Sequence, residues 1–153
     1  MKVPYYRQST DYNCAPATLK MALEYVGINK SEKELAKELK TTPEEGTDYR
    51  NIINFVKKSG LFFYEKSNST LEELENLIRN NYPVIVSFVE PIHEEDHFAL
   101  VVGIEDCEVI LNDPWNGEGF KILKGDFEER WHDAENKPRR WMMVIAKEKI
   151  RLA

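Results

Sequence analysis

A cysteine at the start of a helical pattern is the feature that most constrains this chain. Cys14 follows a polar stretch, residues 8–13, and precedes Pro16, which suits a first helical turn because the N–H that proline lacks is unpaired there. Apolar residues then recur at helical spacing until Gly27. A thiol at a helix N-terminus faces unpaired N–H groups and the positive end of the helix dipole, which both favour the thiolate. Cys14 is therefore either a nucleophile or a small buried residue of the kind common in protein cores.

A second stretch supplies a histidine and a carboxylate that could activate this thiol. His97 begins a run rich in β-branched residues, 98–104, and Asp113 follows a return strand over residues 109–111. A three-residue turn at 104–106 would place His97 directly opposite Asp113, with Cβ atoms about 4.5–5.5 Å apart. A two-residue turn at 105–106 would shift the register and weaken this pairing. The first register predicts that the Asp113 carboxylate holds the His97 imidazole by one ring nitrogen.

The order and spacing of these residues resemble a known family. The motifs are similar to those of the papain-like bacteriocin-processing cysteine peptidases, peptidase family thirty-nine, and their stand-alone relatives. They are Gln8, Cys14-Ala-Pro-Ala, His97-Phe with a Val-Val-Gly run, and Asn-Asp113-Pro. The resemblance extends over most of the chain. It implies a papain-like fold in which Cys14 is the nucleophile, His97 the base and Asp113 its orienting group, with Gln8 contributing to the oxyanion hole.

One departure from the family pattern concerns the residue after the nucleophile. The family usually has glycine there, and this chain has Ala15. Alanine keeps its backbone N–H, so no oxyanion donor is lost, but its methyl group bears on how a substrate fits.

The remaining patterns predict an α+β protein. Helices are expected over residues 31–39, 48–58 and 70–80, of which the first and last begin with the capping-box pairs Ser31/Glu34 and Thr70/Glu73. Strands are expected over residues 61–64, 84–89, 98–104, 109–111, 119–123 and 141–146, and a short helical turn over 126–131. Helices mostly precede strands, which favours an N-terminal helical half packed on a C-terminal antiparallel sheet. At 153 residues, the chain is expected to form one domain, residues 1–153.

Composition limits the partners and the compartment. The net charge of −6 argues against a nucleic-acid partner, and no apolar stretch approaches the length of a membrane-spanning helix. Met1-Lys2 leads into polar residues rather than an apolar signal sequence. The two cysteines are far apart in sequence, and Cys107, beside the hairpin turn, is expected to be an inert thiol. A reducing cytoplasm and the absence of a cofactor are therefore expected.

Alternative functions remain open. The zinc-peptidase pattern is matched by His93, Glu94 and His97, but that pattern binds zinc only on a helix. Here Pro91 precedes the three residues and a predicted strand follows them, so they are expected to lie in a loop. No metal site is therefore expected, and zinc hydrolysis is kept as an alternative. The same scaffold could also transfer an acyl group to an amine or bind peptides without catalysis. The expected substrate is a peptide or another acyl amide, and neither its identity nor the oligomeric state follows from the sequence.

Overall fold

A six-stranded antiparallel sheet organises the fold of this computed structural model, which describes residues 1–132 and 138–152. The strands lie in the order β1-β6-β2-β3-β4-β5. Their bounds are β1 (Phe62–Lys66), β2 (Val84–Val89), β3 (Asp96–Glu105), β4 (Glu108–Asp113), β5 (Gly117–Leu123) and β6 (Met142–Ala146). β6, the last strand in sequence, pairs with both β1 and β2 and so lies inside the sheet.

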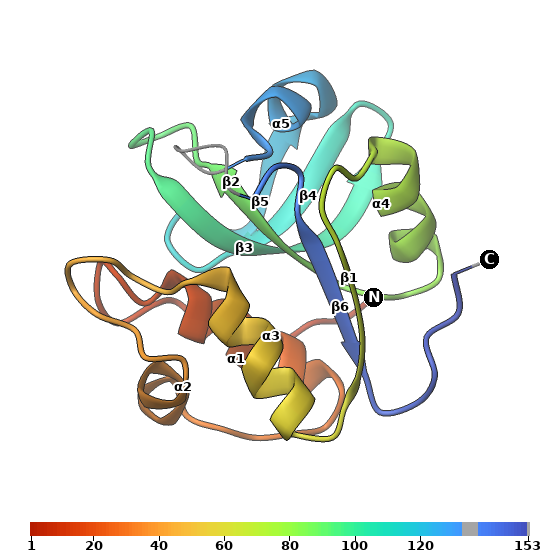
Figure 1. The fold of residues 1–153 in the computed structure, drawn as a ribbon. Coiled ribbons are helices and arrows are strands. Elements are labelled where there is room, and N and C mark those ends of the chain that lie inside the picture. Colours follow the sequence, from red (N-terminus) through yellow and green to blue (C-terminus); the bar gives the residue numbers. More distant parts are fainter. Residues whose placement is uncertain (133–137, 153) are drawn as a thin grey trace.

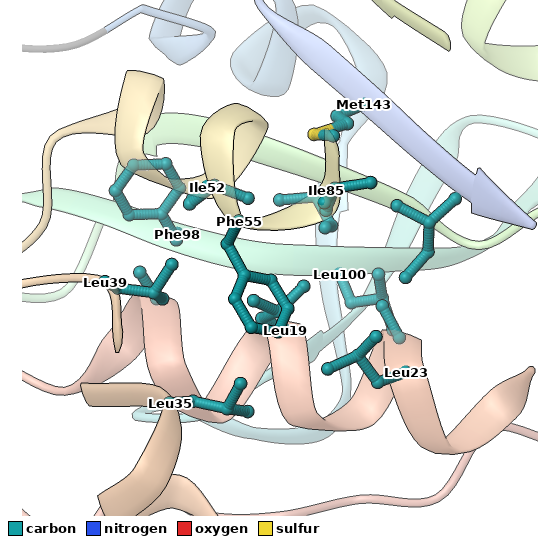
Figure 2. Packing of buried hydrophobic residues seen from close by; sticks show 14 of the residues in the cluster. Leu19, Leu23, Leu35, Leu39, Ile52, Phe55, Ile85, Phe98, Leu100 and Met143 are labelled. Atoms are coloured by element: carbon teal, nitrogen blue, oxygen red, sulfur yellow. The ribbon is translucent and has the colours of Figure 1, made fainter. Parts of the chain in front are cut away.

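Helices cover both faces of this sheet. In the described part of the chain, three helices lie on one side of the sheet and two on the other (Figure 1). The first group is α1 (Cys14–Tyr25), α2 (Glu32–Glu38) and α3 (Tyr49–Lys58), and the second is α4 (Leu71–Arg79) and α5 (Lys124–Arg130). Apolar side chains from α1, α2 and α3 pack against one face of the sheet (Figure 2), and this core includes Leu19, Leu35, Ile52, Phe55, Ile85, Phe98 and Leu100. The second core lies against α4 and α5 and includes Leu74, Val84, Val86, Phe88, Val101 and Phe127.

The helix starts follow the capping signals in the sequence. The hydroxyl of Ser31 accepts a hydrogen bond from the backbone N–H of Glu34 at 3.1 Å, and the Glu34 side chain completes the capping box. Thr70 and Glu73 form the same arrangement at α4. Both predicted capping boxes are therefore confirmed, because a side-chain oxygen at each helix start satisfies an N–H that has no partner within the helix.

The predicted α+β class, with N-terminal helices packed on an antiparallel sheet, is confirmed with one elaboration. β1 precedes α4 in the chain, and α5 lies between β5 and β6. The sheet is therefore enclosed on both faces rather than covered only by the N-terminal helices. This enclosure explains why the strand over 84–89 is apolar except for Ser87, since successive residues such as Val84 and Ile85 enter different cores.

The predicted register of the β3–β4 hairpin is wrong. The turn consists of two residues, Asp106 and Cys107, because Glu105 pairs with Glu108. Asp106 adopts a left-handed conformation (φ 44°), which suits a tight hairpin turn and which aspartate tolerates. An irregularity then follows between Val101 and Gly103, beyond which Leu100 pairs with Asn112. Continuing this register places Asp113 level with residue 99 rather than with His97.

Candidate active site

His97 and Asp113 meet at the end of the β3–β4 hairpin. The Nε2 atom of His97 lies 2.5 Å from the Oδ1 atom of Asp113. Both side chains are buried, with 6% of His97 and none of Asp113 exposed. The register places Asp113 opposite residue 99, two positions from His97 along β3. Side chains two positions apart point to the same face of a strand, so the imidazole of His97 can reach diagonally to the Asp113 carboxylate.

A β-bulge at Val102 makes this shared face possible. Gly103 pairs with Ile110 and Val101 with Leu111, so Val102 is one extra residue in β3. Without that extra residue, the register set by the two-residue turn would place His97 and Asp113 on opposite faces, because a shift of one residue reverses every side chain. The bulge therefore restores the alignment that the histidine and the carboxylate need.

Asp113 is held as a carboxylate by several donors. Its Oδ1 atom accepts backbone hydrogen bonds from Trp115 at 2.9 Å and Asn116 at 3.0 Å, and Oδ2 accepts one from the Asn116 side chain at 3.2 Å. Burial alone would raise the pKa of Asp113, but the hydrogen bond and charge of His97, together with these backbone donors, lower it. The group is therefore ionised at neutral pH.

His97 is correspondingly held in its protonated form. Burial alone would lower its pKa, but the hydrogen bond to Asp113 and the interactions with the Cys14 side chain outweigh burial and raise the pKa from 6.5 to about 10. Because Nε2 is engaged by Asp113, Nδ1 is the ring nitrogen left for the sulfur of Cys14. The ring also packs edge-on against Phe88, with centroids 5.9 Å apart.

Helix α1 brings Cys14 to this ring. Cys14 is the first residue of α1 and is partly exposed, whereas the apolar residues behind it are buried. One turn further along the helix, the buried Thr18 hydroxyl donates a hydrogen bond of 3.2 Å to the carbonyl oxygen of Phe98, the residue after His97. This bond joins α1 to β3 at the level of the site. It could not be predicted from the sequence, because its partners are 80 residues apart.

The start of α1 leaves backbone donors beside the sulfur. Asn13 occupies the N-cap position, but its side chain makes no capping hydrogen bond and instead donates to Glu32 at 2.9 Å. The Asn13 side chain therefore accepts no hydrogen bond from the first-turn N–H groups of α1. Unpaired N–H groups at a helix start stabilise an anion. Ala15 is 1% exposed, and its extra methyl group is buried in the core formed with α1, α2 and α3.

Gln8 is placed against the Asp113 end of the hairpin. Its backbone N–H donates to the carbonyl oxygen of Pro114 at 2.9 Å, and Tyr5 anchors the same segment by donating to the Asp113 carbonyl oxygen at 2.7 Å. The Gln8 side chain is 7% exposed and donates to the Thr10 carbonyl oxygen at 2.7 Å. That bond uses one hydrogen of the amide and leaves the second as a donor.

The two histidines of the zinc-like pattern lie in different elements of the structure. His93 lies in the loop between β2 and β3, where its Nδ1 atom is 3.0 Å from Glu90 Oε1, and His97 lies on β3. They therefore do not share a helix face, as the zinc-peptidase pattern requires. Within residues 1–132 and 138–152, no group of three or more histidine, cysteine, aspartate or glutamate side chains is arranged for a metal ion.

Cys107 is exposed in the hairpin turn, at the opposite end of β4 from Asp113. No helix in the described part of the chain has the length and apolar character needed to cross a membrane.

Sequence comparison connects the chain to a family and to two archaeal proteins. A family model described as "Peptidase_C39 like family" matches residues 1–138. An uncharacterized protein of Methanothermobacter marburgensis is 32% identical over 111 residues, which cover 72% of this chain and 71% of that protein. One from Methanothermobacter thermautotrophicus is 33% identical over 107 residues, covering 70% and 68%.

Solved structures share the fold at low sequence identity. A putative C39-like peptidase from Bacillus anthracis has a TM-score of 0.80 at 18% identity, covering 97% of this chain and 96% of that one. The peptidase domain of Streptococcus ComA, a bi-functional ABC transporter, has a TM-score of 0.76 at 22% identity, covering 94% and 98%. A double glycine motif protease from an AMS/PCAT transporter, in complex with its leader peptide, has a TM-score of 0.74 at 20% identity, covering 96% and 93%.

Proposed function

Because the chain belongs to the Peptidase_C39 like family, we propose that it is a cysteine peptidase that uses Cys14, His97, Asp113 and Gln8. The observation that carries this proposal is the hydrogen bond between the buried His97 ring and the Asp113 carboxylate. The Cys14 side chain acts on the same ring and contributes to its raised pKa. A thiol, an imidazole and a carboxylate in this order form the arrangement that activates a cysteine nucleophile.

The first step is attack by the sulfur. His97 carries the proton taken from Cys14, and the thiolate forms a bond to the carbonyl carbon of the scissile peptide. The carbonyl oxygen becomes an oxyanion, which accepts hydrogen bonds from the Cys14 backbone N–H and the Gln8 side-chain amide. Donors in fixed positions stabilise this charge because they need no reorganisation as it develops.

The second step releases the amine and then the acid. His97 gives its proton to the leaving nitrogen as the C–N bond breaks, and a thioester remains on Cys14. A water molecule then loses a proton to His97 and attacks the thioester, and the C–S bond breaks to give a carboxylic acid and the free thiol. Asp113 keeps the ring in one tautomer and stabilises the imidazolium in both steps.

A peptide is the substrate class that we propose. Support comes from the related double glycine motif protease, whose structure contains a leader peptide. The archaeal relatives are uncharacterized, so the peptide sequence must be found by experiment.

The test is a peptide-library cleavage profile followed by mass spectrometry. We expect the wild-type chain and the control variant Cys107→Ser to cut the same peptides, and Cys14→Ala to cut none of them. Half of the library would carry paired glycines, so that a preference for them is visible. Cleavage that survives in Cys14→Ala would contradict the proposal, as would activity that chelation removes and zinc restores.

A further inference from the structure

Glu90 is a buried carboxylate that the mechanism above does not use. It follows β2 directly, is 2% exposed and accepts four hydrogen bonds. The backbone N–H groups of Ile92 and His93 donate at 2.7 Å each, His93 Nδ1 lies at 3.0 Å, and Asn116 Nδ2 donates at 3.4 Å. A buried carboxylate needs such donors because an unpaired charge in a protein interior is strongly destabilising.

Asn116 connects Glu90 to the candidate active site. Its Nδ2 atom carries two hydrogens and lies 3.4 Å from Glu90 Oε2 and 3.2 Å from Asp113 Oδ2. Its backbone N–H donates to Asp113 Oδ1 at 3.0 Å. Two carboxylates therefore face one amide group, and this fixes its orientation, since the flipped amide would direct its oxygen at both of them.

The backbone of Glu90 also shapes the segment that leads to His97. Glu90 N–H donates to the Glu95 carbonyl oxygen and Glu94 N–H donates to the Glu90 carbonyl oxygen, both at 3.0 Å. Arg130 at the end of α5 holds this loop from outside through two hydrogen bonds of 2.8 Å to the Glu94 carboxylate. Glu90 thus contacts both the segment before His97 and the residue that binds Asp113.

We propose that Glu90 is a positioning residue for the reaction proposed above, acting through Asn116 on the Asp113 carboxylate. The backbone N–H groups of Trp115 and Asn116 hold Oδ1 of Asp113 toward His97, and the Asn116 side-chain amide holds Oδ2, so this amide completes the orientation of the carboxylate about its Cβ–Cγ bond. Asn116 in turn keeps its amide toward Asp113 because Glu90 takes its second hydrogen. Loss of Glu90 frees the amide, lets the carboxylate turn, and weakens the imidazolium that stabilises the Cys14 thiolate.

The test compares Glu90→Gln, Asn116→Ala and the double variant, with Glu94→Gln as the matched control. Glutamine keeps the size of Glu90 but offers one acceptor oxygen in place of two. Glu94 lies in the same loop and is paired with Arg130, yet none of its hydrogen bonds reaches Asp113. The readouts are the rate of Cys14 alkylation by iodoacetamide as a function of pH and the free energy of unfolding of each variant.

We expect Glu90→Gln and Asn116→Ala each to slow Cys14 alkylation near neutral pH by about tenfold, and the double variant to be no slower than the slower single variant. Glu94→Gln should leave the alkylation profile unchanged. A role confined to folding predicts a lower free energy of unfolding with an unchanged profile, and that result would overturn the proposal. Fully additive effects of the two substitutions would overturn it as well.

Asn116→Ala provides the test if Glu90→Gln does not fold. Asn116 is only partly buried, so its substitution is expected to be tolerated. An unchanged alkylation profile in that variant would overturn the proposal. Wild-type alkylation also separates the two proposals. A wild-type Cys14 that reacts no faster than Cys107 defeats the proposed function, whereas a fast wild-type Cys14 with unchanged variants defeats only the role of Glu90.

Discussion

His97 and Asp113 form a hydrogen bond of 2.5 Å although they are not opposite one another in the β3–β4 pairing. The bulge at Val102 aligns Asp113 with residue 99, so the imidazole reaches diagonally across the two strands. This geometry leaves the His97 Nε2 atom with the carboxylate and the second ring nitrogen for Cys14.

Substitutions of Asp113 separate its charge from its shape. Papain-like proteases work with a Cys-His-Asn arrangement, and Asp113→Asn keeps an oxygen that can accept from His97, so we expect a loss of peptidase rate below about tenfold. Asp113→Ala removes the acceptor, and we expect a loss of about 10² or more. Steady-state rates and thermal melting of both variants provide the comparison. Small and equal losses would mean that Asp113 only shapes the turn before Pro114, leaving Asn112 or Asn116 as the orienting group.

Gln8→Ala tests the oxyanion donor. Removing one such donor typically lowers a rate by about 10²–10³. Single-turnover hydrolysis of an activated ester should show this loss, while Cys14 remains as reactive toward iodoacetamide as in the wild type. An unchanged ester rate would leave Gln8 as a residue that merely anchors the N-terminal segment to Pro114.

Thr18→Val tests the bond between α1 and β3. Valine keeps the shape of threonine but leaves the Phe98 carbonyl oxygen without its donor. We expect the free energy of unfolding to fall by about 1 kcal/mol and the peptidase rate to fall modestly, because the Cys14 sulfur loses a constraint one turn away. Denaturant unfolding would measure the first effect, and no loss of stability would show that the hydroxyl bond is replaced by water.

The raised pKa of His97 predicts how the free energy of unfolding changes with pH. Its pKa in the folded chain, about 10, lies above the ordinary value of 6.5. Stability from the protonated ring is therefore fully present below about pH 6.5 and is lost as the pH rises toward about 10. The difference in unfolding free energy between the wild type and His97→Gln should shrink across this window. A difference that stays constant or grows would contradict the assignment of a protonated ring.

Much of this arrangement was predictable from local sequence signals. The start of α1 at Cys14 and the capping boxes at Ser31 and Thr70 depend on residues within a turn of one another, and the structure confirms them. The pairing of His97 with Asp113 was also expected. The roles of Cys14, His97, Asp113 and Gln8 in catalysis stay predictions.

The parts that escaped prediction depend on long-range or irregular geometry. The bulge at Val102 leaves no sequence signature, because a β-branched valine fits an ordinary strand equally well. Thr18 and Glu90 are polar residues whose partners become neighbours only after the sheet forms. Asn116 lies three residues after Asp113, a spacing typical of a turn, but its second bond to Glu90 requires the folded hairpin.

The most direct test of the central claim is a competition between the two thiols of the wild-type chain for limiting iodoacetamide at about pH 6, with the sites mapped by mass spectrometry. Cys107 is exposed and Cys14 only partly so, so exposure alone predicts that Cys107 reacts first. The thiolate–imidazolium pair predicts that Cys14 reacts first, because the thiolate is the reacting species, and that His97→Ala abolishes this preference. Faster modification of Cys107 in the wild type would contradict the account.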